Sequence, residues 1–89
     1  MNSINVVRKI YANGKVEDVD EKMTLEQVQK FVGGLIEYTD STIPHRSLIV
    51  NEEGLMLDLP INLNASKLLR HPEAAINGKL SGDALLVKS

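Results

Sequence analysis

The sequence predicts an α+β fold: a mainly antiparallel, twisted sheet of about six strands with two short helices packed on it. Three observations lead to this prediction. An Asn-Gly pair at 13–14 separates two β-rich segments, a capped helix stops at Gly33-Gly34, and two apolar runs flank a turn sequence at 51–54. The 89 residues suffice for one compact domain spanning 1–89.

The first predicted element is a β-hairpin. Residues 4–12 are rich in strand-forming side chains, and the Asn-Gly pair that follows favours a tight turn because both residue types accept positive φ. Residues 15–19 are then the returning strand. Val16 and Val19 break strict alternation, so we expect a bulge or an early strand end there.

A helix is predicted over 24–32. It opens with a capping box, in which Thr24 accepts from a first-turn N–H and Gln27 reaches back to the N–H of Thr24. Apolar side chains then recur on one helical face. Gly33 stands where a residue of left-handed conformation commonly closes a helix.

The next segment alternates and predicts a strand over 35–39. Ile36 and Tyr38 lie on one face of this strand and Glu37 on the other. A polar loop over 40–46 follows.

A second hairpin is predicted from strands at 47–50 and 55–59, joined by the turn at 51–54. A short helix over 63–70 follows, capped by Asn62 or Asn64. Its expected buried side chains are Leu63, Leu68 and Leu69. We expect a loop at 73–79 with a turn at Asn77-Gly78, and a closing strand at 84–87.

Composition excludes several classes of protein. The chain has no cysteine, which rules out disulfides, thiolate metal sites and cysteine nucleophiles. A net charge of −2 fits neither a phosphate-neutralising nucleic-acid binder nor a strongly acidic DNA mimic. No apolar run is long enough for a secretion signal or a membrane span, so we expect a cytoplasmic protein without a membrane partner. Because aromatic residues are scarce and the core is small, we expect a homo-oligomer.

Three segments together resemble a family of small uncharacterised proteins found mainly in bacteriophages, plasmids and their hosts. They are VGGLIE at 32–37, LIVNEEG at 48–54 and LPIN at 59–62, and the resemblance extends over about residues 23–88. It implies a soluble domain of mobile-element origin, located in the host bacterial cytoplasm, and it carries over no catalytic residue. The segment 66–80 is longer and less polar than in that family, so the resemblance says little about it.

Several chemically interesting residues have a simpler structural explanation. Gly33-Gly34 lies at a helix C-terminus, whereas phosphate loops precede a helix N-terminus, so the pair is interpreted as a helix stop. His45 and His71 have no ligand partner three or four residues away, which disfavours a zinc site. We therefore expect no metal and no cofactor.

Six residues are candidates for ligand binding. Glu37 projects from a strand where it can line a groove, next to Tyr38; amides read bases and ribose, and arginines meet phosphate. Turn and cap roles for the asparagines, and solvated surface charge for the arginines, are the alternatives. The candidate set is Glu37, Tyr38, Arg46, Asn62, Asn64 and Arg70.

Three functions remain open on this basis. The first is a non-enzymatic binding module that antagonises host defence by sequestering a nucleotide-like immune signal. The second is a protein–protein inhibitor of a host nuclease or regulator, comparable to an anti-CRISPR protein. The third is a small enzyme acting on a nucleotide, with Glu37 as its base.

Overall fold

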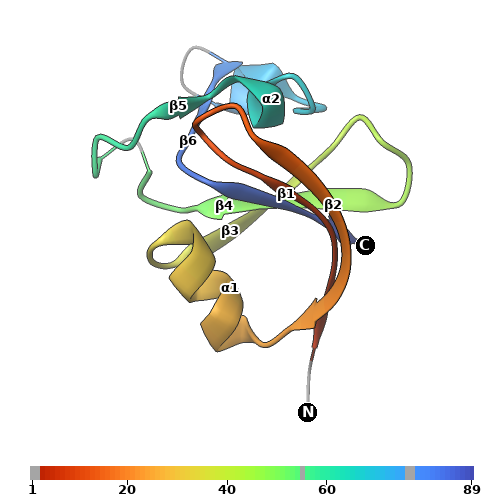
Figure 1. Ribbon diagram of the computed structural model, residues 1–89. Coiled ribbons are helices and arrows are strands. Elements are labelled where there is room, and N and C mark those ends of the chain that lie inside the picture. Colours follow the sequence, from red (N-terminus) through yellow and green to blue (C-terminus); the bar gives the residue numbers. More distant parts are fainter. Residues whose placement is uncertain (1–2, 55, 76–77) are drawn as a thin grey trace.

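A five-stranded antiparallel sheet, in the strand order β2-β1-β7-β4-β3, forms the centre of the computed structural model, which describes residues 3–54, 56–75 and 78–89 (Figure 1). Its strands are β1 (Ile4–Ile10), β2 (Val16–Met23), β3 (Ile36–Asp40), β4 (Arg46–Asn51) and β7 (Ala84–Lys88). The remaining elements are α1 (Leu25–Val32), β5 (Ile61–Asn62), α2 (Leu63–Ser66), the 3₁₀ turn η1 (Pro72–Ala74) and β6 (Leu80–Ser81). The predicted α+β class, with a mainly antiparallel sheet and two short helices, is confirmed.

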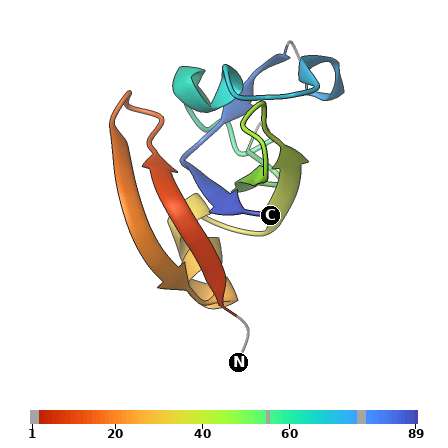
Figure 2. The same ribbon diagram turned by 90° about the vertical axis from the view of Figure 1, so that its right-hand side faces the viewer.

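Both faces of the sheet are covered. Figure 1 shows α1 below the sheet, with α2, β5 and β6 above it; Figure 2 shows the long, curved β1–β2 hairpin from another side. One buried cluster lies on the α1 face: Val6, Met23, Val28, Val32, Ile49, Leu85 and Val87. The other lies under the 61–81 segment: Ile10, Leu48, Val50, Ala65, Leu69, Ala84 and Leu86. The core is aliphatic, as composition predicts.

The first hairpin forms as predicted. β1 and β2 are antiparallel, with Ile10 opposite Val16, and Gly14 takes φ 99° in the turn. The expected bulge is present, because the register shifts where Val19 and Asp20 of β2 oppose a single residue of β1. β2 then continues to Met23, so the alternative of an early strand end is wrong.

Helix α1 also forms as predicted, with both bonds of the capping box. The Gln27 N–H donates to Thr24 Oγ1 at 3.1 Å, and the Thr24 N–H donates to Gln27 Oε1 at 2.9 Å. Gly33 closes the helix in the left-handed region at φ 88°. The helix carries the chain from β2, at one edge of the sheet, to β3 at the other.

The second predicted hairpin is wrong. The turn exists, since the Gly54 N–H donates to the Asn51 carbonyl at 3.2 Å, but residues 56–58 continue as turns and Asp58 has φ 55°. Leu55, the first residue of the predicted 55–59 strand, lies outside the described residues. The physical reason is that both edges of β4 are already occupied, by β3 and by β7, so no further strand can pair with it.

The second helix is shorter than predicted. α2 ends at Ser66 instead of Arg70 and is capped by Asn62, whose Oδ1 accepts from the Ala65 N–H at 3.0 Å. Leu63 was expected to be buried, but it is 58% exposed, and Ala65 fills the core position instead. The predicted loop at 73–79 contains most of η1, and Asn77 of the predicted turn lies outside the described residues. The small β5–β6 ladder was not predicted.

Candidate functional site

Four of the six candidate residues lie along one side of the molecule. Glu37 and Tyr38 belong to β3, Arg46 begins β4, and Arg70 donates its backbone N–H to the carbonyl of Asp40 at 3.1 Å. This side combines the outer edge of β3, the loop 41–45 and the segment 68–73, and we call it the β3 edge region.

Asn62 is not part of this region, and its prediction as a ligand-binding residue does not hold. Its side chain is fully buried, and Nδ2 donates to the carbonyls of Ile10 and Gly82 at 2.8 and 2.9 Å. Asn62 therefore has no surface to offer a ligand. Asn64 lies apart too, and its Nδ2 donates to the Gly14 carbonyl at 3.2 Å.

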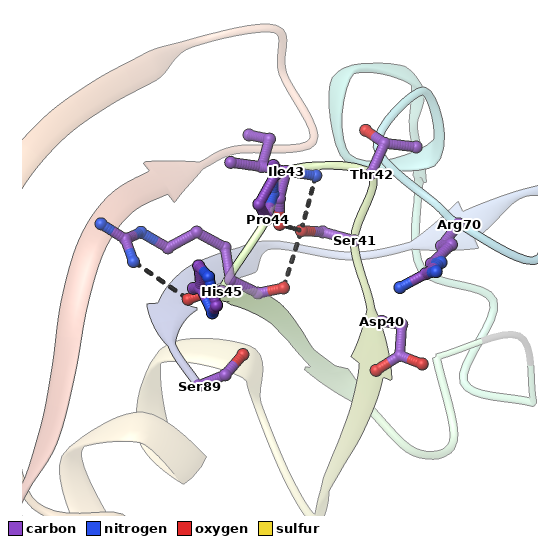
Figure 3. Close-up of a pocket in the computed structure, with 9 residues that line it drawn as sticks. Asp40, Ser41, Thr42, Ile43, Pro44, His45, Arg70 and Ser89 are labelled. Atoms are coloured by element: carbon purple, nitrogen blue, oxygen red, sulfur yellow. Dashed lines mark hydrogen bonds between the residues drawn. The ribbon is translucent and has the colours of Figure 1, made fainter.

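Ser41 holds the loop between β3 and β4 in shape. Its hydroxyl is buried, lies 2.8 Å from the Arg46 carbonyl, and accepts from the Ile43 N–H at 3.2 Å (Figure 3). The Thr42 N–H donates to the Leu68 carbonyl at 2.8 Å, which ties the loop to the segment after α2. These bonds hold the base of the loop in a defined position.

A hollow of about 570 Å³ lies beside this loop. Arg46 uses Nη1 to donate to the His45 carbonyl at 2.9 Å, and Arg70 lies beside Asp40 in the view of Figure 3. Two arginines, one histidine and one aspartate are therefore among the residues that line the hollow. The residues lining it are Asp40, Ser41, Thr42, Ile43, Pro44, His45, Arg46, Arg70 and Ser89.

The outer edge of β3 is only partly paired. The Glu52 N–H donates to the Leu35 carbonyl at 2.8 Å, so the main-chain groups of residues 35, 37 and 39 point towards β4. Those of Ile36, Tyr38 and Asp40 therefore point outwards. The Asp40 carbonyl is taken by Arg70, but the outward groups of Ile36 and Tyr38 have no partner among residues 3–54, 56–75 and 78–89.

Proline explains why the pairing stops. Ser41 forms a bridge with Leu69, and in the same register residue 72 would oppose Tyr38. That residue is Pro72, which has no N–H to donate, and the chain turns there into η1. Pro72 is therefore the sequence signal for this open edge.

Two smaller hollows adjoin β3, one of about 450 Å³ and one of about 280 Å³. The larger is lined by Tyr38, Thr39, Asp40, Ser47, His71 and Glu73. The smaller is lined by Glu37, Tyr38, Thr39, Leu69, His71, Ala75 and Leu80. The second hollow thus has an apolar wall with a carboxylate at its rim.

The region lacks the groups that a metal site would need. No group of three or more His, Cys, Asp or Glu side chains comes together in the part of the chain that the structure describes. The His71 and Glu73 side chains lie 3.4 Å apart, and both are exposed. No helix among the described residues is long and apolar enough to cross a membrane.

The fold and this region define a small α+β domain whose sheet keeps part of one edge accessible. The chain belongs to the family described as a domain of unknown function (DUF3846), whose model matches residues 4–89. No curated protein and no solved structure shows significant similarity to it.

Proposed function

We propose that the domain is a non-enzymatic binding module that recognises a partner protein through the outer edge of β3. The observation that carries this proposal is the pair of residues, Ile36 and Tyr38, whose outward N–H and C=O groups are unpaired among the described residues. Unpaired strand edges bind extended segments of other proteins, with main-chain bonds providing affinity and neighbouring pockets providing specificity. The two hollows lined in part by Tyr38 and Thr39 of β3 would supply such pockets.

The opposite edge of the sheet supports this choice of surface by contrast. β2 carries four acidic side chains in its eight residues, and it contains the bulge at Val19 and Asp20. Charges and bulges are the usual protection of a sheet edge against pairing. β3 has one charged residue, Glu37, between Ile36 and Tyr38 and a second, Asp40, at its end, and it shows no register shift against β4.

The resemblance to proteins of bacteriophages and plasmids suggests which partners to test first. We propose a host defence protein, such as a nuclease or regulator, which the domain would inhibit by occupying one of its extended segments. This makes the protein–protein inhibitor the preferred function, and the domain would act in the bacterial cytoplasm.

Affinity capture from a bacterial lysate, followed by reconstitution with the purified partner, tests the proposal. Hydrogen exchange then reports where the partner binds, and we expect the amides of Ile36 and Tyr38 to exchange more slowly in the complex. A reconstituted complex that leaves both amides unchanged, while slowing others, would place the partner elsewhere and overturn the edge proposal.

A nucleotide-like ligand is a second candidate, supported by the hollow that Arg46 and Arg70 share. Arginine recognises phosphate through paired N–H groups, and His45 lines the same hollow. Thermal-shift measurements with cyclic dinucleotides and ADP-ribose derivatives test it. A rise in melting temperature that disappears in both Arg46→Gln and Arg70→Gln supports this function, and no rise with any of these compounds argues against it.

A further inference from the structure

We infer that the open edge selects its partner by charge: it takes an extended, antiparallel segment with lysine or arginine opposite Glu37, and it rejects a second copy of this chain. The inference rests on the proposed function and adds the chemistry of the partner segment. Three features of the β3 edge region lead to it: the direction of the free main-chain groups, the hollow beside Glu37, and the consequence of self-pairing.

The direction of the main chain determines what can stand opposite Glu37. The outward groups of Ile36 and Tyr38 provide two donors and two acceptors, enough to bind a short segment at both positions. Glu37 lies between them, with its own main-chain groups turned to β4. In an antiparallel pair, such a position brings opposing side chains closest, with Cβ atoms roughly 4.5–5.5 Å apart.

The surroundings of Glu37 favour a long basic side chain at that opposing position. Glu37 is exposed, and it shares its hollow with Leu69, Ala75 and Leu80. Lysine and arginine have an aliphatic stem that covers apolar surface and a charged end that reaches a carboxylate. The other charged or titratable groups on or beside the strand include Asp40, Arg70, His71 and Glu73, and the side chains of His71 and Glu73 lie 3.4 Å from each other.

Self-pairing would create a repulsive contact instead. Two copies that use all four of these groups must pair Ile36 of one copy with Tyr38 of the other, because among residues 3–54, 56–75 and 78–89 these are the outward-facing positions of β3 at which both the N–H and the C=O lack a partner. Glu37 then lies directly opposite Glu37, and like charges at that position are destabilising. If Tyr38 stood opposite Tyr38, Ile36 of one copy would stand opposite Asp40 of the other. The Asp40 carbonyl already accepts from the Arg70 N–H, so it is not free for this pairing.

A displayed library of random linear peptides, selected against the whole domain, tests the inference. We expect strand-forming sequences with lysine or arginine at one fixed position. A selected peptide should bind the Glu37→Lys variant about tenfold or more weakly than it binds the wild type, because an attractive charge pair becomes repulsive. The same charge change on the other edge, Asp20→Lys, is the matched control and should leave the affinity within about twofold.

A second pair of variants separates main chain from side chain. Tyr38→Ala keeps the outward N–H, whereas Tyr38→Pro removes it, so only the proline variant should lose most of the binding. A peptide with glutamate in place of its basic residue should regain affinity for Glu37→Lys. That recovery remains informative if the proline variant fails to fold.

The contrary outcomes are distinct. Selected peptides without a fixed basic residue, or with equal affinity for wild type and Glu37→Lys, would overturn the charge selection but leave the edge as the binding surface. If no peptide is selected, or if the peptides are indifferent to Tyr38→Pro, the strand-pairing inference is wrong. Hydrogen exchange on a reconstituted partner complex then decides separately whether the proposed function survives.

Discussion

Three asparagines show how a single residue type takes different roles in this chain. The Asn51 side chain donates to the Val32 carbonyl at 3.0 Å and accepts from the Glu53 N–H at 2.7 Å, which joins α1 to the turn after β4. Asn62 joins α2 to the ends of β1 and the segment before β7. Both amides satisfy main-chain groups that the fold buries, and only the partly exposed Asn64 makes a single bond.

Replacing Asn62 by alanine should therefore lower the free energy of unfolding by about 3 kcal/mol, because it removes two buried hydrogen bonds, to the carbonyls of Ile10 and Gly82, and the cap of α2. Asn64→Ala is the matched control and should cost less than about 1 kcal/mol. Urea unfolding followed by circular dichroism measures both. Equal losses for the two variants would contradict the assigned role of Asn62.

The Lys9–Glu21 ion pair should contribute a small, pH-dependent stabilisation. Lys9 Nζ lies 3.1 Å from Glu21 Oε1, and this hydrogen bond, with the attraction of the same carboxylate, raises the pKa of Lys9 above its ordinary 10.5. A raised pKa in the folded state means that the stabilisation is fully present at neutral pH and is lost as the pH rises through the folded-state pKa.

Because Glu21 is well exposed, water screens the pair, and Glu21→Gln should cost only about 0.5 kcal/mol at neutral pH. Unfolding curves of wild type and variant, recorded at neutral pH and again well above 10.5, should converge at the higher pH. A difference that stays constant over that range would mean that the charge of Lys9 is not involved.

At the scale of elements, sequence reasoning succeeded where the determinants are local. The Asn-Gly turn, the Thr24–Gln27 capping box and the Gly33 helix end are each fixed by residues within one or two turns of chain. The 55–59 strand failed because its partner was assigned by sequence proximity, while β4 pairs with β7, which is distant in sequence. Alternation of apolar and polar residues indicates a strand, but it does not show which other strands pair with its two edges.

The candidate site was predictable to the same extent. Glu37 and Tyr38 are neighbours in sequence, and they lie on one strand as the alternating pattern predicts. Arg46 and Arg70 are distant in sequence, and they line one hollow only because the segment after α2 returns to the β3–β4 loop. Asn62 was misassigned because burial depends on both core layers being assembled. The open edge was not predicted, since it depends on where the chain leaves β3.

The main-chain directions assigned to β3 predict that two adjacent proline substitutions destabilise the protein to different extents. Thr39→Pro removes an N–H that points to β4, and it should lower the free energy of unfolding by about 3 kcal/mol or more. Tyr38→Pro removes an outward N–H, so it should cost much less, on the order of 1 kcal/mol. Thermal or urea unfolding distinguishes them. If Tyr38→Pro were the more destabilising variant, the N–H of Tyr38 and not that of Thr39 would point to β4.

At the scale of the whole molecule, both faces of the sheet are used internally, so association depends on its edges and on the apolar side chains left outside. Four large exposed side chains fall close together in sequence around the turn after β4 and the start of α2: Met56, Leu57, Ile61 and Leu63. The expected homo-oligomer stays a prediction. If it forms, we expect it to use this apolar surface and not the β3 edge, where Glu37 opposes itself.

Removing that charge should allow the edge to pair with itself. In Glu37→Gln the repulsion is gone while the four outward main-chain groups of Ile36 and Tyr38 remain. The association constant for dimer formation should therefore rise by about tenfold. Sedimentation velocity over a concentration series measures the constant for the wild type and the variant. Adding Tyr38→Pro to Glu37→Gln should cancel the gain, because the outward N–H is lost, whereas Asp20→Asn on β2 should give no gain. A wild-type dimer in which the amides of Ile36 and Tyr38 are already protected from exchange would show that Glu37 does not keep this edge free.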